Sequence, residues 1–298
     1  MRPCKKKHHK TIAYGGAETK GRTITPLVFL IPAFLLVTIF VLYPVVSTAS
    51  LSLFQDSKFV GFNNYLEIFG RKSFSQALIH NGLWILIHLP LSVFFGLLLA
   101  VLLRQVKGGV IIKSIVFLGM VIPMVIGGVL FRFVYDADAG VVNAFLRFIG
   151  LGSIARSWTF YPDTALISLI IGTIWIWTGF SMIVYSAGLE GIPIELYEAA
   201  KIDGASRWKT FWRITVPMLR PATIVVVTMT LLWVLKVFDV VYVATFGGPG
   251  GASTVMAFEM YLDAFQAFNF GRASAIATIL TLMTFGFAAY MVNRMAKS

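Results

Sequence analysis

Apolar residues along this chain gather in six long stretches, and the polar residues collect between them. The stretches cover residues 26–54, 77–103, 111–135, 164–189, 221–246 and 274–292. A helix that crosses a bilayer needs about 20 predominantly apolar residues, and each stretch has roughly that length or more. The pattern therefore predicts an all-α membrane protein with six transmembrane helices.

The third stretch carries the weakest signal of the six. It has Lys113 and Arg132 near its ends, and Pro123 followed by Gly127-Gly128 in its middle. Proline removes a backbone donor and clashes with the preceding turn, so an interrupted helix is expected here. A membrane tolerates such a break where neighbouring helices or water satisfy the freed backbone groups.

Composition excludes two classes of protein. Of the 298 residues, 58% are hydrophobic and 13% are charged, and the mean hydropathy is +0.82. Soluble domains carry about 25% charged residues, so a soluble enzyme and a disordered protein are both excluded. The run from Pro26 to Phe54 is longer than the roughly 7–15 apolar residues of a signal peptide, which predicts an uncleaved first span. The one cysteine, Cys4, allows no internal disulfide.

The net charge of +12 has an uneven distribution that predicts orientation. With the amino terminus inside, the inside segments hold 17 lysines and arginines and the outside loops hold 6. The positive-inside rule then places both termini in the cytoplasm, with the chain crossing the membrane several times. We expect a basic tail over 1–25, a six-helix domain over 26–292 and a short end over 293–298. No basic fold is left to bind nucleic acid.

The inside segment 190–220 is longer than a tether and has a helical pattern. Pro193 suits a first helical turn, and Asp203-Gly204 is typical of a helix end and a sharp turn. A second helix is expected from Ser206, as its N-cap, to Ile214, ending before Pro217 and Pro221. The segment predicts a helix–turn–helix at the membrane surface with one face able to dock. An amphipathic loop without a partner remains the alternative on periodicity alone.

Specific residues within this segment resemble a known family. Glu198-Ala199-Ala200, then Gly204, Ile214 and Val216-Pro217, are similar to the EAA loop of binding-protein-dependent ABC importer permeases, although the family prefers Leu where Val216 stands. Further matches in order are Gly188-Leu189, Ile192-Pro193, Ile202 to Ala205, Asp138 to Asn143 with Leu146 and Gly150, and Thr245 to Pro249 with Ser253-Thr254. The resemblance is to the carbohydrate (maltose and multiple-sugar) branch, and it implies a type I ABC importer permease fold for residues 26–292. It also implies a multi-pass protein of the prokaryotic plasma (inner) membrane.

The resemblance implies how such a chain works. The loop would be a coupling helix that docks on one subunit of a cytoplasmic ATPase dimer, which binds ATP and magnesium; no cofactor is expected on this chain. The implied coupling residues are Glu198, Ala199, Ala200, Asp203, Gly204, Ile214 and Pro217. The implied partners are a second, different permease subunit, an extracytoplasmic sugar-binding protein, the sugar and membrane lipid.

Catalytic and metal motifs are missing from the sequence. No GxxxxGK[ST] phosphate loop is present, and Gly247 to Gly251 lacks the lysine that such a loop needs. His80 and His88 have no carboxylate or cysteine at metal-binding spacing, and no grouping of residues suggests an enzyme. We therefore expect a transport subunit with neither a catalytic nor a metal site.

Two helix faces are candidates for the substrate pathway. In the carbohydrate branch one face of the fifth helix lines the sugar site, and here the resemblance places Thr230, Trp233, Val234 and Val237 on it. Trp177 and Phe180 are candidates on the fourth helix. An indole can stack on the apolar face of a pyranose. Ordinary helix packing is the alternative for both faces.

Lys236 and Asp239 are charges inside the fifth stretch, three residues apart on the expected helix. Charges in a membrane are costly, so a pair or a water-filled neighbourhood is expected. One interpretation is a charge in the pathway or a gate, and the other is a mutually neutralising pair that orients the helix. An ion- or proton-coupled secondary transporter that uses these two residues is the alternative function.

Overall fold

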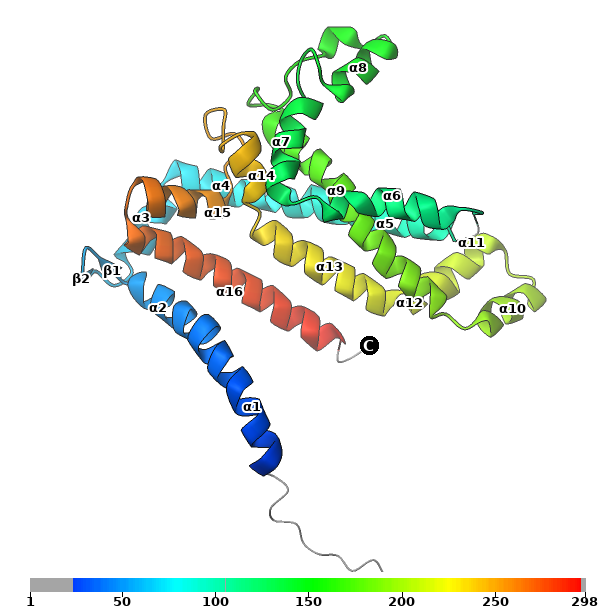
Figure 1. The fold of residues 1–298 in the computed structure, drawn as a ribbon, viewed down its shortest axis with the longest axis horizontal. Helices are drawn as coiled ribbons and strands as arrows, with labels where there is room; N and C mark the ends of the chain where they lie inside the picture. Colours follow the sequence, from blue (N-terminus) through cyan, green and yellow to red (C-terminus); the bar gives the residue numbers. More distant parts are fainter. Residues whose placement is uncertain (1–23, 105, 296–298) are drawn as a thin grey trace, which may run out of the picture. The chain divides into compact units, whose positions relative to one another are not determined.

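The structure is a computed structural model that describes residues 24–104 and 106–295 (Figure 1). Its elements, in chain order, are α1 (Ile24–Val37), η1 (Thr38–Leu42), α2 (Tyr43–Leu51), β1 (Phe54–Gln55), β2 (Lys58–Phe59), α3 (Asn63–Gly70), α4 (Lys72–Leu83), η2 (Trp84–His88), α5 (Leu89–Leu102), α6 (Gly109–Val121), α7 (Met124–Val134), α8 (Val141–Phe148), η3 (Gly152–Ile154), α9 (Ala165–Glu190), α10 (Ile194–Ile202), α11 (Arg207–Thr210), η4 (Phe211–Thr215), α12 (Val216–Met218), α13 (Arg220–Leu235), α14 (Asp239–Ala244), α15 (Met256–Tyr261), η5 (Leu262–Gln266) and α16 (Phe270–Met295).

Four helices in the described residues are long and apolar enough to cross a membrane. They run over Phe29–Leu51, Lys72–Leu102, Ala165–Glu190 and Phe270–Arg294. Two bent helix pairs, α6 with α7 and α11–α12 with α13, bring the number to six if each pair is one span. The chain forms two units, residues 1–47 and 48–298. The first span begins in the first unit, and its helix from Phe29 to Leu51 has no buried side chain.

The predicted break in the third span is confirmed. Helix α6 ends at Val121 and α7 starts at Met124, and the two axes differ by 103°. Ile122 is extended, with ψ of 122°, as the residue before a proline prefers. A single continuous helix over 111–135 is therefore absent.

The expected uninterrupted fifth span over 221–246 is wrong. Helix α13 ends at Leu235, and α14 begins after a break over residues 236–238. Asn81, a buried residue of α4, donates from its amide nitrogen to the carbonyl of Val234 at 3.2 Å and accepts from the backbone N–H of Met256 at 2.9 Å. The Val234 carbonyl also accepts from the backbone N–H of Val237 at 3.3 Å, so the side chain of Asn81 adds a second hydrogen bond at the end of the broken helix.

Three of the prolines in the described helices lie two residues after a wide turn of the π type; Pro32 of α1 does not. The turns η1, η2 and η4 end at Leu42, His88 and Thr215, and the prolines are Pro44, Pro90 and Pro217. A proline ring clashes with the carbonyl four residues earlier, and a locally widened turn moves that carbonyl away. The expected helix end at Ile214 is therefore wrong, because the helix continues through Pro217 to Met218 before it bends by 63° into α13.

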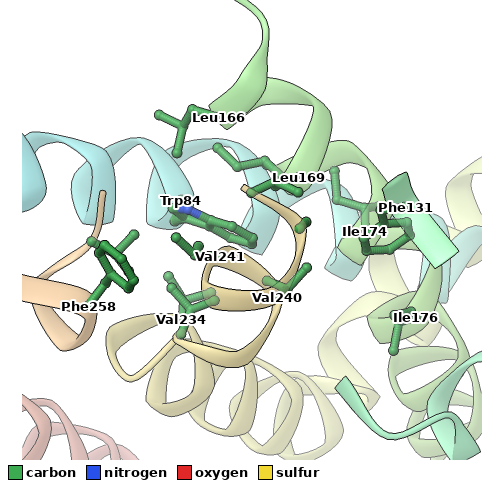
Figure 2. Close-up of a cluster of buried hydrophobic side chains, with 14 of the residues drawn as sticks. Trp84, Phe131, Leu166, Leu169, Ile174, Ile176, Val234, Val240, Val241 and Phe258 are labelled. Atoms are coloured by element: carbon green, nitrogen blue, oxygen red, sulfur yellow. The ribbon is translucent and has the colours of Figure 1, made fainter. Parts of the chain in front are cut away.

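Helix α9 is the central packing element of the second unit, and it contacts α5, α6, α7 and α13. Small residues allow these approaches: a Cβ on Gly96 of α5 would lie 2.2 Å from the Cβ of Ser181. The largest core cluster joins Trp84, Leu166 and Leu169 to Val234 and Val241 (Figure 2). This core holds the fourth and fifth spans against the second.

Candidate functional site

The coupling loop, residues 190–220, forms the predicted helix–turn–helix. Helix α10 covers Ile194–Ile202, and Pro193 is its N-cap, one residue before the first helical turn in which it was expected. Its end is a Schellman motif: the N–H of Ala205 bonds the carbonyl of Ala200, and that of Gly204 bonds Lys201. Gly204 has a φ of +68° there, a conformation that glycine adopts without strain.

The second helix of the loop begins at its predicted cap. The Ser206 hydroxyl accepts a hydrogen bond from the backbone N–H of Lys209 at 3.3 Å. Two contacts tie the loop to the rest of the unit: the hydroxyl groups of Tyr197 and Thr215 are 3.2 Å apart, and the Arg104 guanidinium lies 5.0 Å from the centre of the Tyr197 ring. These bonds hold the two helices and the end of the second span together as one body.

The predicted coupling residues differ in exposure. Glu198, Ala199, Asp203, Gly204 and Pro217 are exposed, Ile214 is half-buried and Ala200 is buried. Ala200 is only 7% exposed because it packs on its own chain, so its small size serves the internal packing of the loop. Ala199 and Glu198 belong to the face that is open to a partner.

Three tryptophans and a histidine form an aromatic box between the second, fourth and fifth spans. The rings of Trp177 and Trp233 have centroids 5.1 Å apart, and His88 lies 5.2 Å from Trp233 and 6.4 Å from Trp177. Trp84 closes the far side at 5.7 Å from Trp233. Phe180 stands beside Trp177 at 5.5 Å. The two candidate helices therefore bring Trp177, Phe180 and Trp233 to one place, where all three are partly exposed.

The aromatic box contains polar atoms without a partner. Both ring nitrogens of His88 and the indole N–H groups of Trp84 and Trp177 are buried and make no hydrogen bond in the described residues. The Thr230 hydroxyl, three residues before Trp233 on α13, is also buried without a partner. Buried unpaired polar groups cost about 1–3 kcal/mol each, so such a concentration marks a place where water or a hydroxylated ligand gains hydrogen bonds.

The prediction from the sequence did not include His88 and Trp84 among the site residues. Their four-residue spacing places them on one face of the second span. That spacing indicates that the two rings share a helix face. Nothing in the sequence indicates that this face packs against Trp177 and Trp233.

The other predicted lining residues of the fifth span lie deeper. Thr230 and Val234 have no exposed surface, and Val237 is 1% exposed. Val234 and Val237 belong to the largest core cluster, which accords with the packing alternative for them. Of the four predicted residues on this span, only Trp233 reaches the surface of the chain.

Lys236 and Asp239 do not form an ion pair, which was one of the two arrangements expected for them. The break after Leu235 separates them, both side chains are exposed, and no ion pair among the described residues includes either one. The expectation that they share one helix surface is wrong because α13 ends before Lys236, whereas Asp239 starts α14.

The buried carboxylate of Asp263 binds two arginines at the other end of the spans. Its two oxygens accept from Arg71 at 2.7 Å and from Arg272 at 3.3 Å, and its side chain is 1% exposed. Glu259, nearby, accepts from Ser73 at 3.1 Å. Burial raises the pKa of the Glu259 carboxyl, against the smaller opposing effects of the Ser73 hydrogen bond and Arg71. We call these residues the Asp263 cluster. Among residues 24–104 and 106–295, no three His, Cys, Asp or Glu side chains gather closely enough to hold a metal ion.

Comparison with known proteins identifies the class. The family model of the binding-protein-dependent transport system inner membrane component matches residues 92–297. The chain belongs to this family and is a permease subunit of an ABC importer, and it resides in the membrane as one component of a larger transport system.

Particular relatives cover nearly the whole chain. A probable ABC transporter permease of Pyrococcus horikoshii is 52% identical over 92% of this chain and 99% of its own. The trehalose/maltose transport system permease MalF of Thermococcus litoralis is 31% identical over 89% of this chain and 92% of its own. In the crystal structure of a bacterial ABC transporter that imports the acidic polysaccharide alginate, one chain matches with a TM-score of 0.77 and 25% identity, over 93% of this chain and 96% of that one.

Proposed function

We propose that this permease carries a sugar or oligosaccharide across the membrane, with energy from ATP hydrolysis on a partner. Its relatives include permeases named for trehalose and maltose, for lactose and for alpha-glucosides. The observation that supports a sugar in this chain is the aromatic box. Its partly exposed indoles offer stacking surfaces, and its unpaired polar atoms offer partners for hydroxyl groups.

Coupling in this proposal runs through the exposed face of α10. Glu198 offers a carboxylate to a basic group of the ATPase, and Ala199 allows close approach. The Schellman turn at Gly204 and the Tyr197–Thr215 contact make the loop rigid. Closure of the ATPase dimer, with ATP and magnesium between its subunits, would then move α10 together with the adjoining spans α9 and α13, and so alternate access to the box.

The proposed assembly contains this chain, a second permease of different sequence, two ATPase subunits and an extracytoplasmic sugar-binding protein. A solved structure related to this chain, with a TM-score of 0.76, is an alginate importer in complex with its oligosaccharide-bound periplasmic protein. No cofactor is assigned to this chain, and both of its termini lie in the cytoplasm, as the distribution of lysine and arginine favours.

Reconstitution tests the proposal. The chain is co-expressed with the neighbouring permease, ATPase and binding protein, the complex is placed in liposomes, and uptake of labelled sugars is measured with and without ATP. We expect uptake only with ATP and with all partners present. Uptake by this chain alone, driven by an ion gradient, would instead support a secondary transporter that uses Lys236 and Asp239.

Two substitutions then test the position of the pathway. Trp233→Ala removes an indole of the aromatic box and should reduce sugar uptake more strongly than Asp239→Asn, which alters an exposed charge outside it. The opposite ranking would place the pathway on the other face of the fifth span.

A further inference from the structure

An apolar groove runs beside the coupling loop, between the second span and the second helix of the loop. Its volume is about 420 Å3. Seven of its eight lining residues are apolar, and Arg207 is the exception; the others are Phe94, Leu97, Leu98, Val101, Trp208, Phe211 and Trp212. Neither the coupling proposal nor the aromatic box uses this groove.

The groove follows the second span, away from the end of that span that is expected in the cytoplasm. Its innermost residue on α5, Phe94, lies eight residues before Leu102, which is about 12 Å along the helix axis. Phe94 is 56% exposed, Trp208 70% and Trp212 52%. A cytoplasmic protein does not reach this depth in the membrane, whereas the acyl chain of a lipid does.

The second helix of the loop has the composition of an interfacial helix. Phe211 and Trp212 lie three and four residues after Trp208, and the centroids of the three rings are 5.3–6.3 Å apart. Arg207, Lys209 and Arg213 alternate with them and are exposed. Tryptophan is enriched where the acyl region meets the headgroups, and a helix of this kind lies in that plane.

The two chain segments that form the groove carry basic charges only, although the acidic Asp203 immediately precedes the second one. Residues 91–113 hold three basic side chains, residues 204–220 hold four, and neither segment contains an acidic residue. The ion pairs of the described residues include none of these bases. Basic pockets beside membrane helices on the cytoplasmic side select anionic headgroups.

We propose that this groove binds an anionic phospholipid, with an acyl chain along Phe94, Leu98 and Trp212 and the headgroup phosphate on Arg207. Because Arg207 begins the helix that follows the Gly204 turn, the bound lipid fixes the position of the coupling loop relative to the second span. The site rests on the membrane location of the chain and is independent of which substrate it carries.

Native mass spectrometry of the purified, delipidated full-length chain tests the site. The probes are phosphatidylglycerol and phosphatidylcholine with the same acyl chains. We expect the unsubstituted protein to prefer phosphatidylglycerol, and Arg207→Gln to weaken that binding about fivefold, as the loss of roughly 1 kcal/mol per basic residue implies. Lys209→Gln is the matched control, because it removes the same charge from the same helix outside the groove.

A second variant tests the acyl chain. Leu98→Trp fills the groove and should reduce the binding of both lipids, while circular dichroism and size-exclusion elution stay unchanged. Equal binding of the two lipids to the unsubstituted protein, equal losses in the Arg207 and Lys209 variants, or full binding in the Leu98 variant would each overturn the proposal. So would displacement of the lipid by the purified ATPase subunit, because the groove would then be a protein interface.

Discussion

The coupling loop and the Asp263 cluster lie on opposite sides of the spans and are held in different ways. In the loop, backbone turns, one serine cap and one hydroxyl pair determine the shape, and most of the predicted coupling residues stay exposed. In the Asp263 cluster, a carboxylate with 1% exposure joins two arginines, one of them 192 residues away. The contrast indicates that one region is shaped locally and left open for a partner, whereas the other is closed by contacts within the chain.

The largest expected effect is a loss of transport when the coupling loop is changed. Glu198→Lys reverses the charge on the open face of α10, so we expect uptake by the reconstituted complex to fall at least about tenfold while the thermal stability of the chain is unchanged. Glu195→Lys, on the same helix and also exposed, is the control. Normal uptake and ATPase activity in the Glu198 variant would remove this residue from the coupling site.

The largest effect on stability is expected at the other region. Asp263→Asn leaves Arg71 and Arg272 without their shared carboxylate, and both arginines are partly exposed, so the cost should be about 2–3 kcal/mol rather than the upper range for buried pairs. Thermal unfolding in detergent measures it. Glu67→Gln, which loosens the 3.5 Å pair with Arg272 and an exposed hydrogen bond from Asn63, should cost less than about 1 kcal/mol. Equal midpoints for the two variants would contradict this ranking.

A smaller effect is expected at the turn of the coupling loop. Gly204→Ala forces a side chain into a left-handed conformation, although no atom lies within 4 Å of the added Cβ, so the cost is strain alone, about 1 kcal/mol. Gly191→Ala, where φ is −76°, should cost less. Chemical unfolding of the two variants gives the comparison, and a larger loss at Gly191 would show that the turn is not strained.

The smallest effect concerns pH. Burial raises the pKa of Glu259 in the folded protein, so the folded state binds more protons than the unfolded state as the pH falls through that pKa. The unprotonated carboxylate therefore lowers stability above the raised pKa, and this penalty is relieved on acidification. Glu259→Gln should be neutral or slightly stabilising at pH 7 and should flatten the dependence of the unfolding midpoint on pH. A midpoint that falls more steeply with rising pH in the variant would contradict this.

Particular residues show which parts of the fold could be predicted from the sequence. The limits of α10, the turn at Gly204 and the cap at Ser206 were predicted correctly, because a proline, a glycine and a serine act on their immediate neighbours. The break in the third span followed from Pro123 for the same reason. The break after Leu235 has no such local signal, and the side chain that bonds the Val234 carbonyl at this break, Asn81, lies about 150 residues earlier in the chain.

In the candidate site, too, some features could be predicted from the sequence and others could not. The sequence by itself determined the membrane class, the loop and its motif, since hydrophobic length and short-range backbone preferences are readable along the chain. Only the tertiary structure decided that Ala200 faces inward, that His88 and Trp84 join Trp177 and Trp233, and that Lys236 and Asp239 do not pair. These outcomes depend on which helix faces meet. That choice is made by packing between spans far apart in the sequence, where apolar surfaces look alike until they are brought together.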